Sequence, residues 1–191
     1  MFRNLLSRRN LILISVGLSV LAAMTIVLAP KRARADEGRP IKGTFTAAYS
    51  GTPNTAGDSF CGGTPRGVEV EAHGAGYSTL GALSFSLNKT RVGSAFHGCL
   101  TLTAPNGDTL NAIYDLTGGT PNANNFSQGT GTLTFTGGTG RFEGASGSAN
   151  MTAVFSNFYP ASSFAGGTAA PLQGVAFYSV DGTLSVQPVD Q

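Results

Sequence analysis

The chain has 191 residues with 12 basic and 10 acidic side chains, a formal charge of +2, and it contains 27 glycines and no tryptophan. Six of the basic residues and none of the acidic ones lie in positions 1–35, so positions 36–191 carry a formal charge of −4. This balance excludes a basic nucleic-acid-binding surface and fits a sparsely charged exported domain.

The first 35 residues have the three parts of a signal peptide. Basic residues come first, with twin arginines at Arg8 and Arg9, and residues 11–30 form a near-continuous apolar run. An Ala-Arg-Ala site ending at Ala35 predicts cleavage there and a periplasmic or extracellular protein. The twin arginines resemble a twin-arginine signal, and that route stays open. An uncleaved anchor also stays open, because about 20 apolar residues can span a bilayer.

After this segment, residues 36–40 form a short tail and residues 41–191 a single domain, long enough for one core. No part of it has a helical period, whereas short segments alternate at period two between apolar and polar residues. Eight strands are predicted over residues 41–49, 67–77, 82–88, 95–103, 109–116, 130–136, 148–158 and 174–186, the last with a bend at Asp181-Gly182.

The predicted strands are separated by turn and loop signals. Asn106-Gly107 predicts a tight hairpin with positive φ at both residues, and residues 117–129 and 159–171 read as loops. Strands joined by short turns pair antiparallel. Eight of them predict an all-β sandwich or closed barrel, and an eight-stranded barrel has room for side chains or one small ligand.

Cys61 and Cys99 lie in the exported part, where disulfides persist. A bridge between them is predicted, and two unconnected buried thiols are the alternative. His73 and His97 have no neighbours at metal-ligand spacing, so no metal site and no cofactor is expected.

The most unusual stretch is "FTGGTGRFEGASG", residues 135–147. Its glycines do not have the spacing of a dinucleotide loop, and a strand rather than a helix is predicted after it. A turn is therefore predicted. Its glycines supply positive φ or permit a bulge, and its one aromatic ring enters the core. The residues of this structural turn are Gly137, Gly138, Gly140, Phe142 and Gly144.

The same stretch resembles a late-strand motif of the dirigent and allene oxide cyclase families. Residues 76–86 and 103–110 are also similar to bacterial exported proteins of the allene-oxide-cyclase-barrel-like type. The resemblance covers about residues 41–186 and implies a calycin-like, eight-stranded antiparallel barrel. It also implies a lumen or mouth that takes hydrophobic small molecules. No residue here matches a catalytic acid of either family, so the catalytic residues stay unknown.

Aromatic residues in phase with the apolar face are the candidates for lining a ligand-binding lumen: Phe45, Tyr49, Phe85, Tyr114, Phe135 and Tyr178. Tyr77 is a further tyrosine that could line the barrel. Glu69, Glu71 and His73 share one face of a strand and could transfer protons if that face were the lumen. A solvated outer face is the favoured interpretation. Arg141 could pair with Glu143 at the turn.

Three functions remain. The leading one is an exported barrel that binds a small hydrophobic molecule in its lumen or at its mouth. The second is a cyclase or isomerase that acts by confinement in the lumen. The third is a structural or interaction barrel with a filled core. A homo-oligomer stays open, contact with a membrane is expected only through an uncleaved signal segment, and nucleic acid is excluded.

Overall fold

The computed structural model describes residues 38–54, 61, 67–158 and 172–186. All eight predicted strands are present, most of them longer than predicted. In chain order they are β1 (Arg39–Asn54), β2 (Gly67–Ser78), β3 (Gly81–Val92), β4 (Ala95–Thr103), β5 (Thr109–Gly118), β6 (Phe126–Gly138), β7 (Ser146–Asn157) and β8 (Leu172–Ser185). The predicted signal segment and the loop 159–171 lie outside the described residues. Within those residues, no helix is long and apolar enough to cross a membrane.

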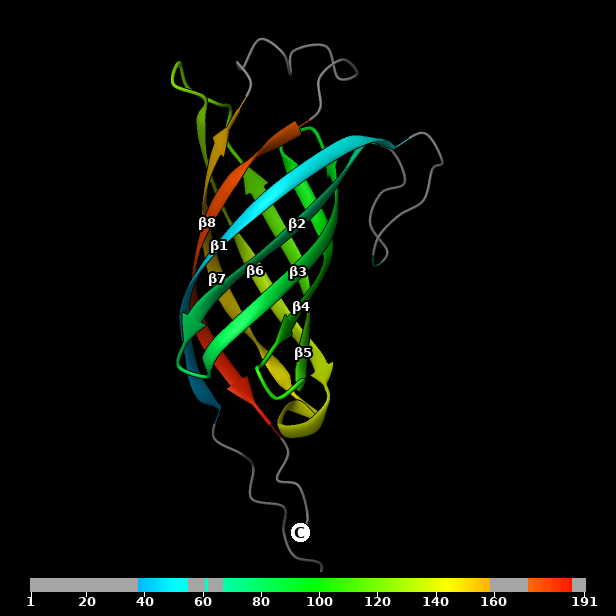
Figure 1. The fold of residues 1–191 in the computed structure, drawn as a ribbon, viewed down its shortest axis with the longest axis vertical. Coiled ribbons are helices and arrows are strands. Elements are labelled where there is room, and N and C mark those ends of the chain that lie inside the picture. The colour runs from blue at the N-terminus through cyan, green and yellow to red at the C-terminus, as the bar shows by residue number, and fades with distance from the viewer. Residues whose placement is uncertain (1–37, 55–60, 62–66, 159–171, 187–191) are drawn as a thin grey trace, which may run out of the picture. The chain divides into compact units, whose positions relative to one another are not determined.

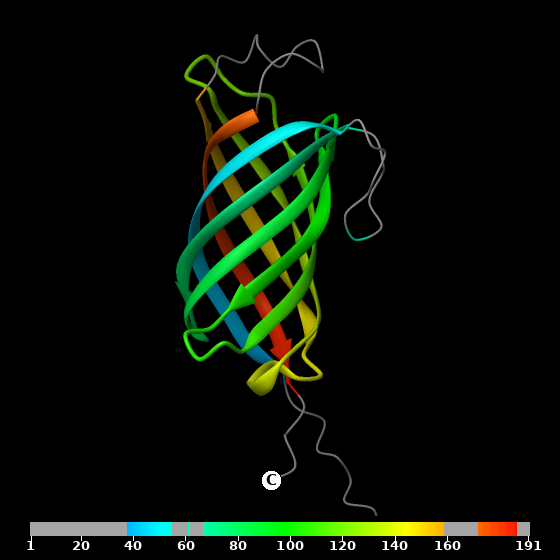
Figure 2. The same ribbon diagram turned by 45° about the vertical axis from the view of Figure 1, so that its right-hand side comes forward.

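The eight strands form one closed antiparallel barrel, each strand pairing with its neighbours in the chain (Figures 1 and 2). Closure comes from β1 and β8, which pair from Arg39 opposite Leu184 to Gly51 opposite Leu172. The predicted all-β barrel is thus confirmed, in the closed form rather than as a sandwich. Asp181-Gly182 does not bend the chain, because both residues pair within the continuous strand β8.

The barrel interior is filled by residues at every second strand position. In β3, Leu83, Phe85 and Leu87 are buried while Gly81, Ala82 and Ser84 are exposed. The other strands alternate in the same way, so Ser and Thr cover much of the outside and aliphatic and aromatic side chains form one core. The alternation of apolar and polar residues in the sequence therefore predicted correctly which side of each strand faces the interior.

One end of the barrel is closed by the turn after β6 (bottom of Figure 1). There the chain makes a 3-10 turn, η2 (Gly140–Phe142), and Phe142 is buried in the core. The register of β5 and β6 shifts between Asn111, which pairs with Gly137, and Ala112, which pairs with Phe135, so β6 has a bulge at Thr136. The bulge turns the chain inward, so that η2 covers the end of the barrel.

Glycines have two different roles in this turn. Gly137 and Gly140 have positive φ, as predicted. Gly144, which was expected to permit a bulge or sharp bend, also has positive φ. Gly138 was predicted to have positive φ and does not. It is needed because a Cβ there would lie 2.9 Å from Cβ of Phe142 and still closer to the carbonyl oxygen of Thr109.

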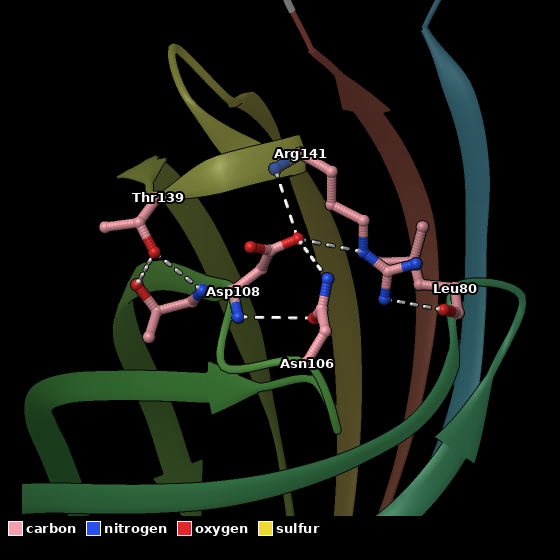
Figure 3. A network of polar contacts seen from close by, with 6 residues as sticks. Leu80, Asn106, Asp108, Thr139 and Arg141 are labelled. Carbon is pink, nitrogen blue, oxygen red and sulfur yellow. Dashed lines mark hydrogen bonds and ion pairs between the residues drawn. The ribbon is translucent and has the colours of Figure 1, made fainter.

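Asp108 joins η2 to the β4–β5 hairpin (Figure 3). Its carboxylate accepts hydrogen bonds from the amide of Asn106 (2.8 Å) and the backbone N–H of Arg141 (3.3 Å). The Arg141 side chain lies 4.0 Å from this carboxylate and donates to the carbonyl of Leu80 (3.1 Å) in the β2–β3 turn. Arg141 thus contacts Asp108, where the sequence suggested Glu143.

The β4–β5 hairpin differs from the predicted form at one residue. Gly107 has positive φ (89°), but Asn106 does not. The N–H of Gly107 donates to the carbonyl of Ala104, and the N–H of Ala104 donates to the carbonyl of Asp108. This is a turn centred on Pro105 and Asn106, followed by a glycine in the left-handed region.

Candidate functional site

All six predicted lumen residues point into the barrel and are buried. Phe45, Phe85, Tyr114 and Tyr178 line a void near the middle of the lumen, together with aliphatic side chains and Met151. Tyr49 lines a second void toward the end of the barrel opposite η2, and Phe135 lines neither. The sequence therefore identified which aromatic residues point inward, but it did not show that they line two separate voids.

The middle void is apolar and small. Its volume is about 20 Å³, which is enough for a single water molecule and not for an organic ligand. The Tyr178 hydroxyl is buried there without a hydrogen-bond partner among the described residues. The side chains of the described lumen thus fill it almost completely, as side chains can in an eight-stranded barrel.

The second void, also about 20 Å³, lies at the end opposite η2, which we call the mouth. Polar and charged groups converge there with aromatic rings. The residues that line it are Tyr49, Val70, Lys89, Arg91, Phe96, Gly118, Gly119, Pro121, Ser127, Phe155 and Asn157. No carboxylate is among them, so the mouth as described is cationic.

Lys89 is the central group of the mouth. Its side chain is inward on β3 and only 1% exposed. Nζ lies 4.5 Å from the ring centroid of Phe96, 4.8 Å from that of Tyr114 and 5.1 Å from that of Phe155. Its one described hydrogen bond goes to the Tyr114 hydroxyl, at 3.4 Å. Lys89 is therefore held by ring faces rather than by an acid.

Burial changes the proton affinity of these groups. Loss of water, with the charge of Arg91 adding to it, lowers the pKa of Lys89 to about 7. Burial raises the pKa of Tyr49 to about 12, although Arg91 acts against it. Burial also raises the pKa of Tyr114 well above its ordinary value. At neutral pH the phenols are thus protonated, and Lys89 exists partly as the free amine.

Arg91 follows Lys89 on the same inward face and is half-buried at the rim. Its guanidinium lies 5.4 Å from the Phe96 ring centroid, and Nε donates to the carbonyl of Gly93 (2.8 Å). No described carboxylate pairs with it. The mouth therefore contains a lysine and an arginine side chain beside stacked rings, since Phe96 and Phe155 lie nearly parallel with centroids 5.9 Å apart.

Glycines make the room for this cluster. A Cβ at Gly98, which pairs with Lys89, would lie 2.6 Å from Cβ of Lys89. A Cβ at Gly118 would lie 2.9 Å from the Phe96 ring. These positions face inward and carry no side chain, so the long side chains of neighbouring strands fill the space above them.

Sequence reasoning missed Lys89 and Arg91. The third predicted strand ended at residue 88, but β3 continues to Val92. The available signal was the phase of Leu83, Phe85 and Leu87, which continues directly to 89 and 91. A lysine is seldom fully buried without an acidic partner, so its polarity argued against an inward position.

Tyr77 and the acidic face of β2 lie on the outside. Val70 and Ala72 are buried, which places Glu69, Glu71 and His73 on the opposite face, away from the lumen. Tyr77 shares their phase and is 76% exposed. Its predicted place in the lumen is wrong, because it is an odd number of residues from the inward positions.

A second polar cluster lies outside the barrel at Cys61 and Cys99. The two cysteines form a disulfide with Cα atoms 5.6 Å apart. His97, two residues before Cys99, hydrogen-bonds Asp115 Oδ1 through Nδ1 and the Cys61 carbonyl through Nε2. These contacts attach Cys61 to β4 and β5. Among the described residues, no group of His, Cys, Asp and Glu could hold a metal ion.

No family model matches the chain, and no curated protein matches it. Among solved structures, the chain is similar to the pterocarpan synthase dirigent protein GePTS1, with 13% sequence identity and a TM-score of 0.44. The match covers 83% of this chain and 92% of that chain. The assignment of a closed eight-stranded barrel rests on the strand pairing described above.

Proposed function

We propose that this protein is an exported barrel that binds a small molecule at its mouth. This small molecule has an apolar body and an anionic or carbonyl group. One observation carries the proposal: Lys89 is fully buried beside three rings with no described carboxylate near it. A buried cation without an anion is costly, and a ligand anion or carbonyl oxygen would offset that cost. Aromatic and apolar surface with a few polar groups is the usual character of such sites.

The mouth must open for a ligand, because the void there holds about 20 Å³. Arg91 is the group that would move. It lies at the rim, and its one described side-chain hydrogen bond goes to the nearby carbonyl of Gly93. Rotation of this side chain toward solvent would uncover the Phe96 ring and Lys89 beneath it. We therefore place binding at the mouth rather than in the middle of the lumen.

Calorimetric titration with a matched pair of compounds tests the proposal. 2-Naphthoate and 2-naphthalenemethanol share an apolar body and differ in charge. We expect the carboxylate to bind at least about tenfold more tightly, a difference of about 1.4 kcal/mol. Lys89→Met should abolish the difference, and Lys42→Met is the matched control because Lys42 lies outside and pairs with Asp181. Equal binding to the wild type and Lys89→Met would reject the proposal.

A filled structural barrel is the rival function, and the small volume of both voids favours it. Native mass spectrometry of the purified protein separates the two functions. A co-purified small molecule, lost in Lys89→Met, supports binding. A clean protein mass together with no binding of 2-naphthoate leaves the structural barrel. A cyclase that confines its substrate would also require the barrel to open, because neither void holds an organic molecule as described.

Export is the second part of the proposal. It is supported by the apolar run of residues 11–30 and the Ala-Arg-Ala site that ends at Ala35. Sequencing the N-terminus of the protein from the extracytoplasmic fraction should begin at Asp36. A protein that retains Met1 in the membrane fraction would instead be anchored.

A further inference from the structure

Lys89 differs chemically from the other lysine in the described chain. Lys42 is outside the barrel and forms an ion pair with Asp181 at 2.9 Å. Lys89 is buried, lies against three aromatic rings and has no described acidic partner. An amine becomes a nucleophile when it loses its proton, and an apolar pocket or a neighbouring cation favours that loss. Lys89 has both, since Arg91 is two residues away on the same face.

The described strands around Lys89 bring no acid to the mouth that would hold it charged. Besides Lys89, the titratable groups that line the two voids are Tyr49 on β1 and Arg91 on β3 at the mouth, and Tyr114 on β5 and Tyr178 on β8 in the middle void. None of these is an acid that ionises near neutral pH, because burial raises the pKa of all three phenols. The described acidic side chains line neither void.

We propose that Lys89 forms a reversible imine with an aldehyde that enters the mouth, so that the ligand class is an apolar, preferably aromatic, aldehyde. This inference rests on the proposed function, since it uses the same mouth. Neutral Nζ attacks the carbonyl carbon, and a C–N bond forms as the carbonyl π bond opens. One Nζ hydrogen moves to the former carbonyl oxygen, which gives a carbinolamine. Its hydroxyl then leaves with the second Nζ hydrogen as water, and the C=N bond of the imine forms. No oxidant or reductant is needed.

Tyr114 is placed to assist proton transfer in this reaction. Its hydroxyl is 3.4 Å from Nζ and is protonated at neutral pH. It can donate its proton to the carbonyl oxygen as that oxygen gains charge, and recover one from Nζ. The rings of Phe96 and Phe155 would lie beside an aromatic aldehyde and exclude water from the imine.

Reductive trapping tests the inference. The purified protein is incubated at pH 7 with 2-naphthaldehyde and sodium cyanoborohydride, which delivers hydride to an imine carbon and makes the bond permanent. Peptide mass mapping should find one naphthylmethyl group on Lys89. The yield on Lys42 should be lower by about tenfold or more, because a lowered amine pKa leaves more free amine at neutral pH. The N-terminal amine, with an ordinary pKa of about 8, should react about three to five times less than Lys89.

Two variants separate the imine from simple binding. Lys89→Arg keeps a cation without a nucleophilic amine, so it should keep 2-naphthoate binding and lose the adduct. Lys89→Met should lose both, and circular dichroism of each variant reports whether the barrel is intact. 2-Naphthoate binding without a Lys89 adduct in the wild type would overturn the imine alone. If the folded wild type neither binds 2-naphthoate nor forms the Lys89 adduct, the proposed function is overturned as well.

Discussion

The hydroxyl of Tyr49 on β1 donates a 2.6 Å hydrogen bond to Oδ1 of Asn157 on β7, passing over Gly174 of the strand between them. Gly174 allows this contact, because a Cβ there would collide with the Tyr49 hydroxyl. The amide of Asn157 in turn donates to the carbonyl of Asn125 at 2.8 Å. Together these two hydrogen bonds link two non-adjacent strands and the β5–β6 loop at the mouth.

We expect Tyr49→Phe to lower the free energy of unfolding by about 1–2 kcal/mol, because Asn157 Oδ1 loses its buried donor. Urea denaturation measures the change. Tyr77→Phe is the matched control, since the Tyr77 side chain is exposed, and it should change stability by less than about 0.5 kcal/mol. Similar losses in both variants would show that the hydroxyl bond contributes nothing specific.

Phe142 anchors the closed end of the barrel. Phe142→Ala should cost about 3–5 kcal/mol of stability, because it leaves a cavity where η2 covers the core. Phe177→Ala removes the same side chain from the outer face of β8 and should cost less than about 1 kcal/mol. Thermal and urea unfolding of the two variants compares them directly. A loss under 1 kcal/mol in Phe142→Ala would mean that the turn does not close the core.

The contact between Gly140 and Asp108 can be separated from backbone strain. Gly107 and Gly140 both have positive φ, so alanine at either site costs about 1–2 kcal/mol. Nothing lies near a Cβ at Gly107, whereas one at Gly140 would collide with the Asp108 carboxylate. Gly140→Ala should therefore cost about 1 kcal/mol more than Gly107→Ala. Equal losses in urea denaturation would contradict the close approach of Gly140 to the Asp108 carboxylate.

His97 should make stability depend on pH. Both ring nitrogens face acceptors, Asp115 Oδ1 and the Cys61 carbonyl, and only the imidazolium can donate from both. The hydrogen bond to Asp115, with that to Cys61 adding to it, raises the pKa of His97 above its ordinary 6.5. The stabilisation that these hydrogen bonds provide is complete at pH values below the unfolded-state pKa of about 6.5. It is lost as the pH rises through the folded-state pKa of His97.

The stability difference between wild type and Asp115→Asn should therefore be larger at pH 6 than at pH 9. An NMR titration, with the resonance assigned through a His73→Gln variant, should also show a lower His97 pKa in Asp115→Asn. A difference in stability that grows with pH would reverse the sign and refute this account.

The disulfide of Cys61 and Cys99 closes a loop with a sequence separation of 38 residues. In the chain-entropy account, such a cross-link stabilises the folded state by about 4 kcal/mol. We expect a Cys61→Ser/Cys99→Ser variant to lose stability of that order. The wild type without reductant should show no thiol that reacts with iodoacetamide after denaturation. Two reactive thiols would mean that the cysteines are unbridged.

The barrel could be predicted from the sequence because its interior is apolar and its strands alternate strictly. Leu83, Phe85 and Leu87 between serines fix the inward face of β3 without any tertiary information. The turn at residues 137–144 could be predicted in part, since Gly137, Gly140 and Gly144 have positive φ, which favours glycine. Here local propensity and the global fold agree.

The mouth could not be predicted in the same way. Lys89 occupies an inward position against its polarity, and what permits this is the set of rings from β4, β5 and β7 that only the closed barrel brings together. Gly98 lies in a strand rather than in a turn. Its role, which is to leave room for the Lys89 side chain, is apparent only from its pairing with Lys89. Such features depend on pairing between strands, which a single sequence does not specify.

The pairing of β1 with β8 has a consequence for how the chain reaches this state. The cylinder can close only when residues 172–185 meet residues 39–51, which are among the most distant segments of the domain. Until then β1 and the strand preceding β8 have unpaired edges that can join other chains. Contacts so distant in sequence form slowly. During synthesis from the N-terminus, the sheet therefore stays incomplete and prone to aggregation until β8 has been made. A chaperone, or rapid release of the chain from the ribosome, would protect it at that stage.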